Sequence, residues 1–164
     1  MKTRLTGLSF AASVAIASAC WAPSALADRD RPTIIADATV TKECGSCHMA
    51  FPAEMLPARS WTAIMEGLSS HFGENAALDA AKTKEIQDWL TAHAGDARNS
   101  NGHYLRGLAK SETPLRITET PYWVREHRKE VRESEYANPK VKSKANCVAC
   151  HKDATKGNFE GDDD

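Results

Sequence analysis

Apolar residues recur at intervals of three and four along two stretches in the first half of the chain, and this period predicts amphipathic helices. The first helix is expected to begin with Ser60 as its cap and to end at Gly73. The second covers about residues 78–93 and stops at Gly95. A shorter helix is expected from near Asp37 into the cysteine-containing segment that follows. The apolar positions of the two longer helices are Trp61, Ile64, Met65, Leu68, Ile86, Trp89 and Leu90.

The second half of the chain alternates short apolar patches with polar loops. A polar run at residues 96–102 sets the predicted boundary between two units, residues 28–98 and residues 99–164. Thr120 and the proline after it form a helix start, because threonine caps well and proline fits the first turn. This helix is expected to cover about residues 121–133, with Trp123, Val124, His127 and Val131 on its apolar side. These patterns together predict a mainly α-helical protein.

The first 27 residues have the pattern of a removable export signal. A basic start precedes an apolar, Ala-rich run at residues 5–20, and residues 25–27 supply a small-residue cleavage motif. The apolar run is too short, and too rich in Ala and Ser, to predict a membrane anchor. Lipoprotein cleavage before Cys20 is the alternative, and it is disfavoured because Ala17 stands where a large aliphatic residue is expected. We therefore expect signal cleavage after residue 27 and export to the periplasm.

Removal of this signal leaves 19 basic and 22 acidic residues, a formal charge of about −3. This near balance does not predict binding to nucleic acid or to anionic lipid. The remaining 137 residues are poor in large apolar side chains. A domain of this size and polarity usually needs a metal or a cofactor to stabilise it.

Four of the five cysteines fall into two copies of one pattern, Cys-x-x-Cys-His. Two thiols three positions apart can form thioethers to the two vinyl groups of one porphyrin, and the next residue, His, reaches the iron from the proximal side. The sequence therefore predicts two covalently attached haem c groups. The predicted attachment residues are Cys44, Cys47, Cys147 and Cys150, and the predicted proximal ligands are His48 and His151.

Other uses of paired cysteines fit this pattern less well. A thioredoxin-like pair needs a buried strand before it, and neither residues 36–43 nor residues 140–146 supply one. A structural zinc site gives no reason for a histidine directly after each pair. An oxidising compartment allows either pair to form a disulfide. Two complete five-residue patterns behind an export signal favour haem.

Each iron of a haem that only carries electrons normally has a sixth ligand, either Met or His. For the second haem we favour His127, because it shares the apolar face of its helix with Trp123 and Val124. His103 is the rival, and it is expected in a solvent-exposed loop. The methionines that could act as ligands, Met49, Met55 and Met65, all lie in the first half.

For the first haem we favour His71, which is expected at the end of an amphipathic helix on the side of Ile64 and Leu68. Met65 faces the same side and is the second candidate, and His93 is the third. A histidine at a helix C-terminus is also stabilised by the helix dipole, by up to about 1 kcal/mol, so a purely structural role for His71 is the alternative.

With these residues in place, the mature chain resembles the dihaem cytochrome c family, small bacterial periplasmic proteins with one haem in each half. The resemblance is carried by residues 44–52, 56–61, 71–74, 116–127 and 146–151. It implies that His71 and His127 are the distal ligands, so that both haems are bis-histidine and low-spin. We expect a class I cytochrome c-like haem domain at the N-terminus, followed by a smaller, less regular helical haem domain.

The same resemblance implies an electron carrier between a membrane b-type cytochrome and a soluble haem protein. Two histidines per iron block small ligands and favour a low reduction potential. The alternatives are a peroxidase-like haem enzyme and a gas-binding haem sensor, each of which needs one iron with an open position. We expect no catalytic residues, no nucleic-acid partner, no membrane insertion and a monomeric protein.

Overall fold

The computed structural model describes residues 37–159, which are mainly helical and form no strand. The α-helices are α1 (Ala38–Cys44), α2 (Ala58–Glu66), α3 (Ala80–Ala92), α4 (Pro121–His127) and α5 (Glu133–Tyr136). Short 3-10 turns occur at Ala53–Met55, Leu68–Ser70, His103–Leu105, Ile117–Glu119, Cys147–Ala149 and Ala154–Lys156. The expectation of a mainly α fold is confirmed.

Within the described range no helix is long and apolar enough to cross a membrane. The predicted export signal, residues 1–27, lies outside that range.

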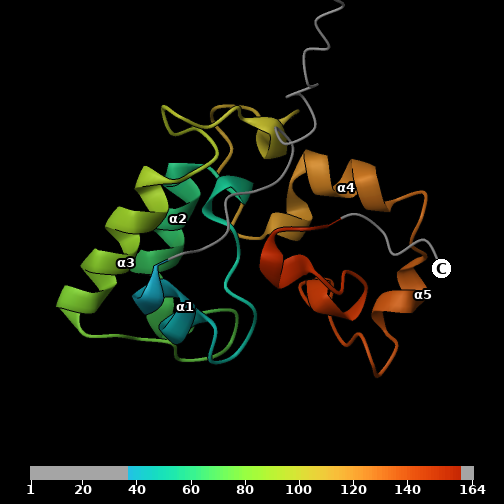
Figure 1. Cartoon of the computed structure of the whole chain (residues 1–164), viewed down its shortest axis with the longest axis horizontal. Coiled ribbons are helices and arrows are strands. Elements are labelled where there is room, and N and C mark those ends of the chain that lie inside the picture. Colours follow the sequence, from blue (N-terminus) through green and yellow to red (C-terminus); the bar gives the residue numbers. More distant parts are fainter. Residues whose placement is uncertain (1–36, 160–164) are drawn as a thin grey trace, which may run out of the picture.

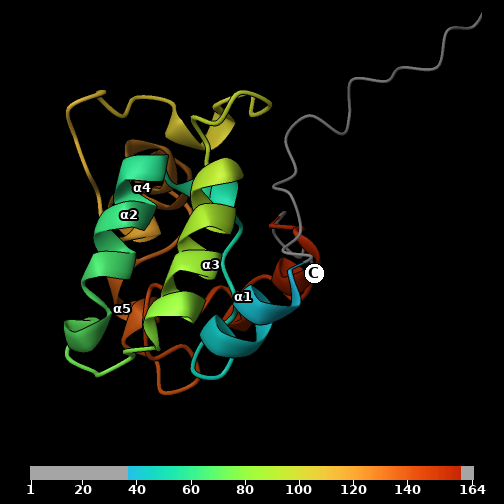
Figure 2. The same ribbon diagram turned by 90° about the vertical axis from the view of Figure 1, so that its left-hand side faces the viewer.

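The helices fall into two groups along the chain. We call residues 37–98 the first half and residues 99–159 the second half. Helices α1, α2 and α3 gather on one side of the molecule, and α4, α5 and the C-terminal segment lie on the other (Figure 1). Within the first half, α2 and α3 lie side by side (Figure 2). The domain boundary near residue 98 stays a prediction.

One hydrophobic cluster forms the core, and all its fully buried members come from the first half. Ile86 of α3 is completely buried, and Val40 ties α1 into the same cluster. Burying a large aliphatic side chain of this kind contributes about 1.5–3 kcal/mol. The buried members are Val40, Ala53, Leu56, Trp61, Met65, Ile86, Leu90 and Ala94.

The helices of the first half begin and end where the free backbone amides and carbonyls of the terminal turns find hydrogen-bond partners. Asp37 caps α1, since its Oδ1 accepts the Val40 amide at 2.8 Å. The prediction for α2 is wrong at both ends. The helix begins directly after Pro57, so that Ser60 lies inside it and is buried rather than capping. It ends at Glu66, because the Gly67 amide turns back to the carbonyls of the last turn.

Helix α4 begins as the sequence predicts and ends six residues early. The Thr120 side chain accepts the Trp123 amide at 3.3 Å, and Pro121 occupies the first turn. After His127 the chain turns, and the His127 carbonyl accepts the amides of Glu130 and Val131 at 3.2 and 2.9 Å. Residues 128–132 are charged apart from Val131, so a longer helix would bury little apolar surface.

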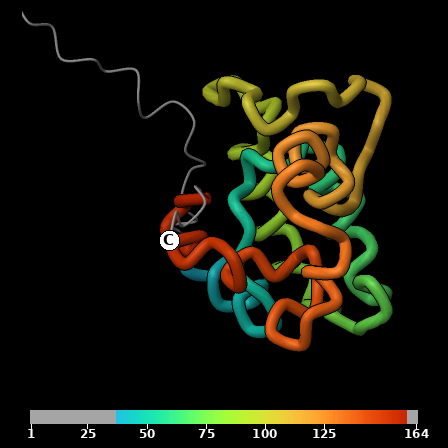
Figure 3. The backbone as a smooth tube through the Cα atoms, turned by 90° about the vertical axis from the view of Figure 1, so that its right-hand side faces the viewer, coloured from blue at the N-terminus to red at the C-terminus, as the bar shows by residue number. Residues whose placement is uncertain are grey.

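Several contacts join the halves, and two of them are hydrogen bonds of Arg59. Arg59 of α2 donates through Nε to the Glu112 carbonyl at 2.6 Å and through a terminal nitrogen to the Ala109 carbonyl at 3.1 Å. The C-terminal segment also lies beside α1 (Figure 3). A cavity of about 260 Å³ there is lined by Thr41, Gly45, Met49, Ala50, Pro52, Ala154, Thr155 and Gly157.

Candidate haem sites

The structure places His48, the residue after the first cysteine pair, against His71. Their ring centres are 6.2 Å apart and their planes differ by 23°. His48 also stacks on Phe51, with ring centres 4.8 Å apart. Its Nδ1 lies 2.7 Å from the Met49 carbonyl, so in the neutral tautomer Nδ1 donates that hydrogen bond and Nε2 keeps its lone pair.

A tight turn holds His71, and α2 ends five residues earlier. The amide and carbonyl of His71 exchange hydrogen bonds with Glu74 at 2.8 and 3.0 Å. Both central residues have positive φ, 53° at Phe72 and 101° at Gly73, as turns of this type require. The Arg116 guanidinium lies 3.9 Å from the centre of the Phe72 ring and covers it from the second half. His71 therefore does not end α2 as expected, but directly follows the 3-10 turn Leu68–Ser70, which is too short to give a strong helix dipole.

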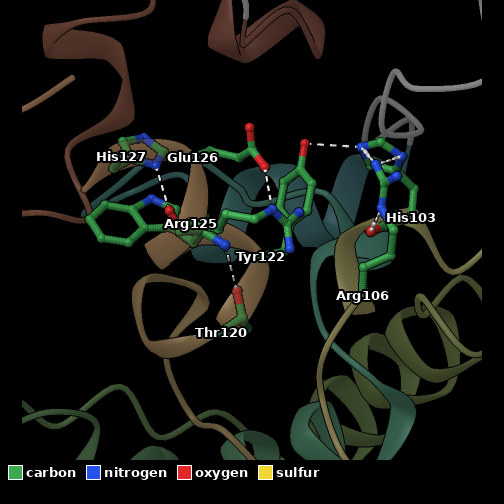
Figure 4. Close-up of polar contacts among 8 residues, drawn as sticks. His103, Arg106, Thr120, Tyr122, Arg125, Glu126 and His127 are labelled. Atoms are coloured by element: carbon green, nitrogen blue, oxygen red, sulfur yellow. Dashed lines mark hydrogen bonds and ion pairs between the residues drawn. The ribbon is translucent and has the colours of Figure 1, made fainter. Parts of the chain in front are cut away.

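In the second half, His127 and His151 face each other across a similar distance. Their ring centres are 6.1 Å apart, and their planes are nearly perpendicular, at 84°. His127 is the last residue of α4, and its Nδ1 donates to the Trp123 carbonyl one turn earlier at 2.9 Å (Figure 4). The Trp123 indole stacks on the same imidazole, with ring centres 4.1 Å apart. These two contacts fix the tautomer and the plane of His127.

A cavity of about 790 Å³ surrounds this second pair. Both cysteines of the second pattern, Cys147 and Cys150, contribute to its wall together with both histidines. Much of the remaining wall is aromatic, which suits the flat apolar face of a porphyrin. The aromatic residues are Tyr104, Tyr122, Trp123, Tyr136 and Phe159.

Burial shifts the pKa values of two histidines and two thiols of these sites toward their neutral forms. Burial lowers the pKa of His71, and the neighbouring His48 and Arg116 lower it further. Burial also lowers the pKa of His127, although the hydrogen bond to the Trp123 carbonyl opposes this. Burial raises the pKa of Cys147 to about 11 and raises that of Cys44 as well. Neutral imidazole is the form that binds iron, whereas a redox-active cysteine pair has a lowered pKa.

Both histidine pairs fit a haem iron between them. A bond from a metal ion to an imidazole nitrogen is about 2 Å long, so two rings on opposite sides of one metal have centres roughly 6 Å apart. Each pair supplies only two protein ligands, and among residues 37–159 no group of three or more His, Cys, Asp or Glu side chains is arranged to hold a metal ion. A porphyrin would complete the coordination.

The rival ligands lie elsewhere. Met65 belongs to the hydrophobic core and is 4% exposed. His93 is exposed at the end of α3, where its ring stacks on Trp89 at 4.2 Å and its Nδ1 donates to the Trp89 carbonyl at 2.8 Å. This repeats the arrangement of Trp123 and His127, but no second histidine ring stacks with or lies edge-on to His93 within the described residues.

His103 is not the exposed loop residue that the sequence suggests. It is partly buried, lines the second cavity and lies 2.9 Å from the Tyr122 hydroxyl through Nε2 (Figure 4). Arg106 donates to the same imidazole and lies over the Tyr122 ring at 5.7 Å. Sequence reasoning missed this cluster, because the contact between His103 and Tyr122 joins positions 19 residues apart and no local period reports it.

Comparison with known proteins identifies the family to which the chain belongs. The model of the family described as dihaem cytochrome c matches residues 40–159. A solved dihaem cytochrome c from Rhodobacter sphaeroides is 46% identical, covers 77% of this chain and 98% of its own, and has a TM-score of 0.72. A second structure, of DHC purified from Rhodobacter sphaeroides, is 42% identical over 77% of this chain and all of that one, with a TM-score of 0.66.

A third structure, a dihaem cytochrome type c from Shewanella baltica, is 41% identical over 75% of this chain and 86% of its own, with a TM-score of 0.61. A search of curated proteins finds no significant match. The chain belongs to the dihaem cytochrome c family. It therefore carries two covalently bound haem c groups with iron, and electron transfer is the function that this membership implies.

Proposed function

We propose that this protein is a periplasmic electron carrier in which both irons are held by two histidines. The observation that carries the proposal is the equal separation of the two histidine pairs, 6.2 and 6.1 Å between ring centres. Such a separation leaves room for one iron and for no further ligand on either face. The first haem-binding part is class I cytochrome c-like and covers residues 28–98, and the smaller part covers residues 99–164.

Each proposed site uses residues from one Cys-x-x-Cys-His pattern and one distal histidine. The irons supply the one-electron ferric/ferrous change when the haems are bound. His48 and His71 hold the first site, and His151 and His127 hold the second. The thioether attachments are assigned to Cys44, Cys47, Cys147 and Cys150.

The chain's own residues keep the donor nitrogens ready. The Met49 carbonyl holds Nδ1 of His48, and the Trp123 carbonyl holds Nδ1 of His127, so that each Nε2 is available without a change of tautomer. Imidazoles held in this way would need no change of tautomer when the bound irons are reduced, which would keep the reorganisation small. This favours electron transfer over ligand binding or peroxide chemistry, since both of these need a position that a histidine does not fill.

The proposed partners are a membrane b-type cytochrome on one side and a soluble haem protein on the other. A carrier must release each partner after one electron has passed, so docking is expected to be weak and to bury less than about 1,200 Å². The protein is proposed to act as a monomer, without inserting into the membrane and without catalytic residues.

Optical and EPR spectra of the haem-loaded protein test this function. We expect only low-spin signals in the ferric state and no change of the ferrous spectrum on addition of carbon monoxide. A high-spin ferric signal or a carbon monoxide adduct would reject the carrier with two closed sites. It would favour the enzyme or the gas sensor instead.

A further inference from the structure

The formal charges divide unevenly between the two halves. Residues 37–98 contain nine acidic and five basic side chains, a net charge of −4. Residues 99–159 contain 12 basic and seven acidic side chains, a net charge of +5. The propionates of one haem in each half would lower both values equally and leave the difference. Within residues 37–159 a net charge of +1 therefore conceals two regions of opposite sign, and regions of this kind steer charged partners. Residues 160–164 add four acidic side chains after the second of these regions.

Four exposed lysines flank the second attachment segment in sequence. We call Lys140, Lys142, Lys144 and Lys152 the lysine rim. The loop that carries three of them folds back on itself before Cys147. Asn146 donates through Nδ2 to the Val141 carbonyl at 2.9 Å, and the Asn138 carbonyl accepts the amides of Val141 and Lys142 at 2.8 Å. Of the four, Lys144 lines the second cavity together with both cysteines, and the other three lie within eight residues of Cys147 or Cys150 in sequence.

Two of the four rim lysines carry charge that no neighbouring acidic side chain in the described part of the chain neutralises. Lys144 pairs with Glu133 at 2.9 Å, but within residues 37–159 neither Lys140 nor Lys142 forms an ion pair. The first attachment segment differs. Lys42 is the only basic residue among residues 37–58, and it lies 3.7 Å from Glu43.

The residues between the paired cysteines differ in the same way. In the second pattern Val148 is 42% exposed, and Ala149 beside it is also exposed. In the first pattern the corresponding residues are Gly45 and Ser46. An exposed apolar centre with a charged border is the composition expected of a small transient interface.

We propose that the lysine rim and Val148 form the docking face for an electron-exchange protein whose own docking face is acidic. The inference rests on the carrier function proposed above and adds the charge of one partner and the haem through which its electron passes. Complementary charge raises the association rate by 10- to 1,000-fold at low ionic strength, and salt weakens it. In each encounter one electron leaves the reduced partner and one ferric haem becomes ferrous.

Two charge-reversal variants test the rim. The probe is reduced flavodoxin, an acidic one-electron donor, and stopped-flow spectroscopy measures the second-order rate constant for reduction of the ferric protein. The variant K140E/K142E changes the rim, and K82E/K84E makes the same change of net charge on α3. At low salt we expect the rim variant to react about tenfold more slowly and to lose the salt dependence of the wild type. The α3 variant should change the rate constant less than about twofold, because its charges lie outside the docking face.

Several outcomes would contradict the proposal that the lysine rim is a docking face. Equal slowing in both variants would show that only the net charge matters. Self-association that depends on Lys140 and Lys142, measured by sedimentation, would assign the face to a second copy of the chain. The sequence also ends in four acidic residues after Phe159, namely Glu160 and residues 162–164, and a chain ending at Phe159 should react at least as fast as the full chain. Slower reaction of that shorter chain would contradict the proposal.

The proposed electron-carrier function can be rejected independently of the proposed docking face. If neither flavodoxin nor dithionite reduces the protein, the proposal of electron transfer fails. Normal reduction by dithionite, with no difference between the two charge variants against flavodoxin, rejects the lysine rim alone.

Discussion

The two histidine pairs have nearly the same separation and different orientations. The ring centres are 6.2 Å apart in the first pair and 6.1 Å apart in the second, but the ring planes differ by 23° in one and by 84° in the other. His71 lies in a tight turn, whereas His127 ends α4 and stacks on Trp123. The separation meets the one requirement that both sites share, room for an iron. The angle between the two ring planes of a pair is instead determined by the local structure around each histidine.

The packing around the two sites differs as well. The first half has a hydrophobic core of eight buried residues, so part of its stability is independent of any cofactor. The second half contributes no fully buried member to that core, only the partly buried Ile117 that packs against it, and its aromatic residues line a cavity instead. A segment that encloses a cofactor-sized space depends on that cofactor for its apolar contacts.

The largest effect is therefore expected on removal of the second haem. The variant C147A/C150A deletes both proposed thioether attachments. Hydrogen exchange should then show α4 and α5 opening with a free energy near zero, about that of a frayed segment, while α2 and α3 stay protected. The matched variant C44A/C47A should leave measurable protection in α2 and α3, because their core remains. Protected α4 amides without the second haem would contradict this division.

Removal of one distal ligand should open one iron at a time. In H127G and H71G, about half of the haems are expected to bind carbon monoxide in the ferrous state, because one of the two irons loses its sixth ligand. Optical difference spectra measure this fraction. H93G is the matched control, since His93 has the same contacts with Trp89 as His127 has with Trp123. Carbon monoxide binding by H93G, or none by H127G, would reject the ligand assignment.

The different ring planes should distinguish the two ferric irons by EPR. Nearly parallel imidazoles raise one of the two iron dπ orbitals more than the other, whereas perpendicular imidazoles raise both alike. We therefore expect a rhombic low-spin signal from the first site and a signal with a larger maximum g value from the second. Two identical signals would contradict the difference of planes.

A smaller effect is expected from a substitution that tests which contact orients the imidazole plane of His127. Trp123→Leu removes the stacked indole and keeps the backbone carbonyl that binds His127, so the signal of the second site should broaden or shift while the first stays unchanged. Trp89→Leu removes an equivalent stacking contact from His93 and should alter neither signal. A shift in both variants would show that the effect is not local to the iron.

The sequence predicted the chemistry of the sites better than the path of the chain between them. The Cys-x-x-Cys-His patterns and the Thr120 cap are local, so spacing alone reveals them. The true end of α2 was missed, because apolar residues continue to Leu68 in helical period although Gly67 ends the helix. The turn at His71 and the contact of Arg116 with Phe72 depend on tertiary structure, which periodicity does not report.

The smallest effect is expected at Met65, the residue that competed with His71 in the sequence. Met65 is 4% exposed and packs in the core of the first half, so Met65→Leu, which conserves volume, should cost less than about 1.5 kcal/mol of unfolding free energy. Ile86→Ala, at a completely buried position of the same core, should cost about 2–5 kcal/mol, because it leaves a cavity. Thermal unfolding of the haem-loaded protein gives both values. If Met65→Leu instead produced carbon monoxide binding at the first haem, Met65 rather than His71 would be its ligand, and the likeness of the two sites would be lost.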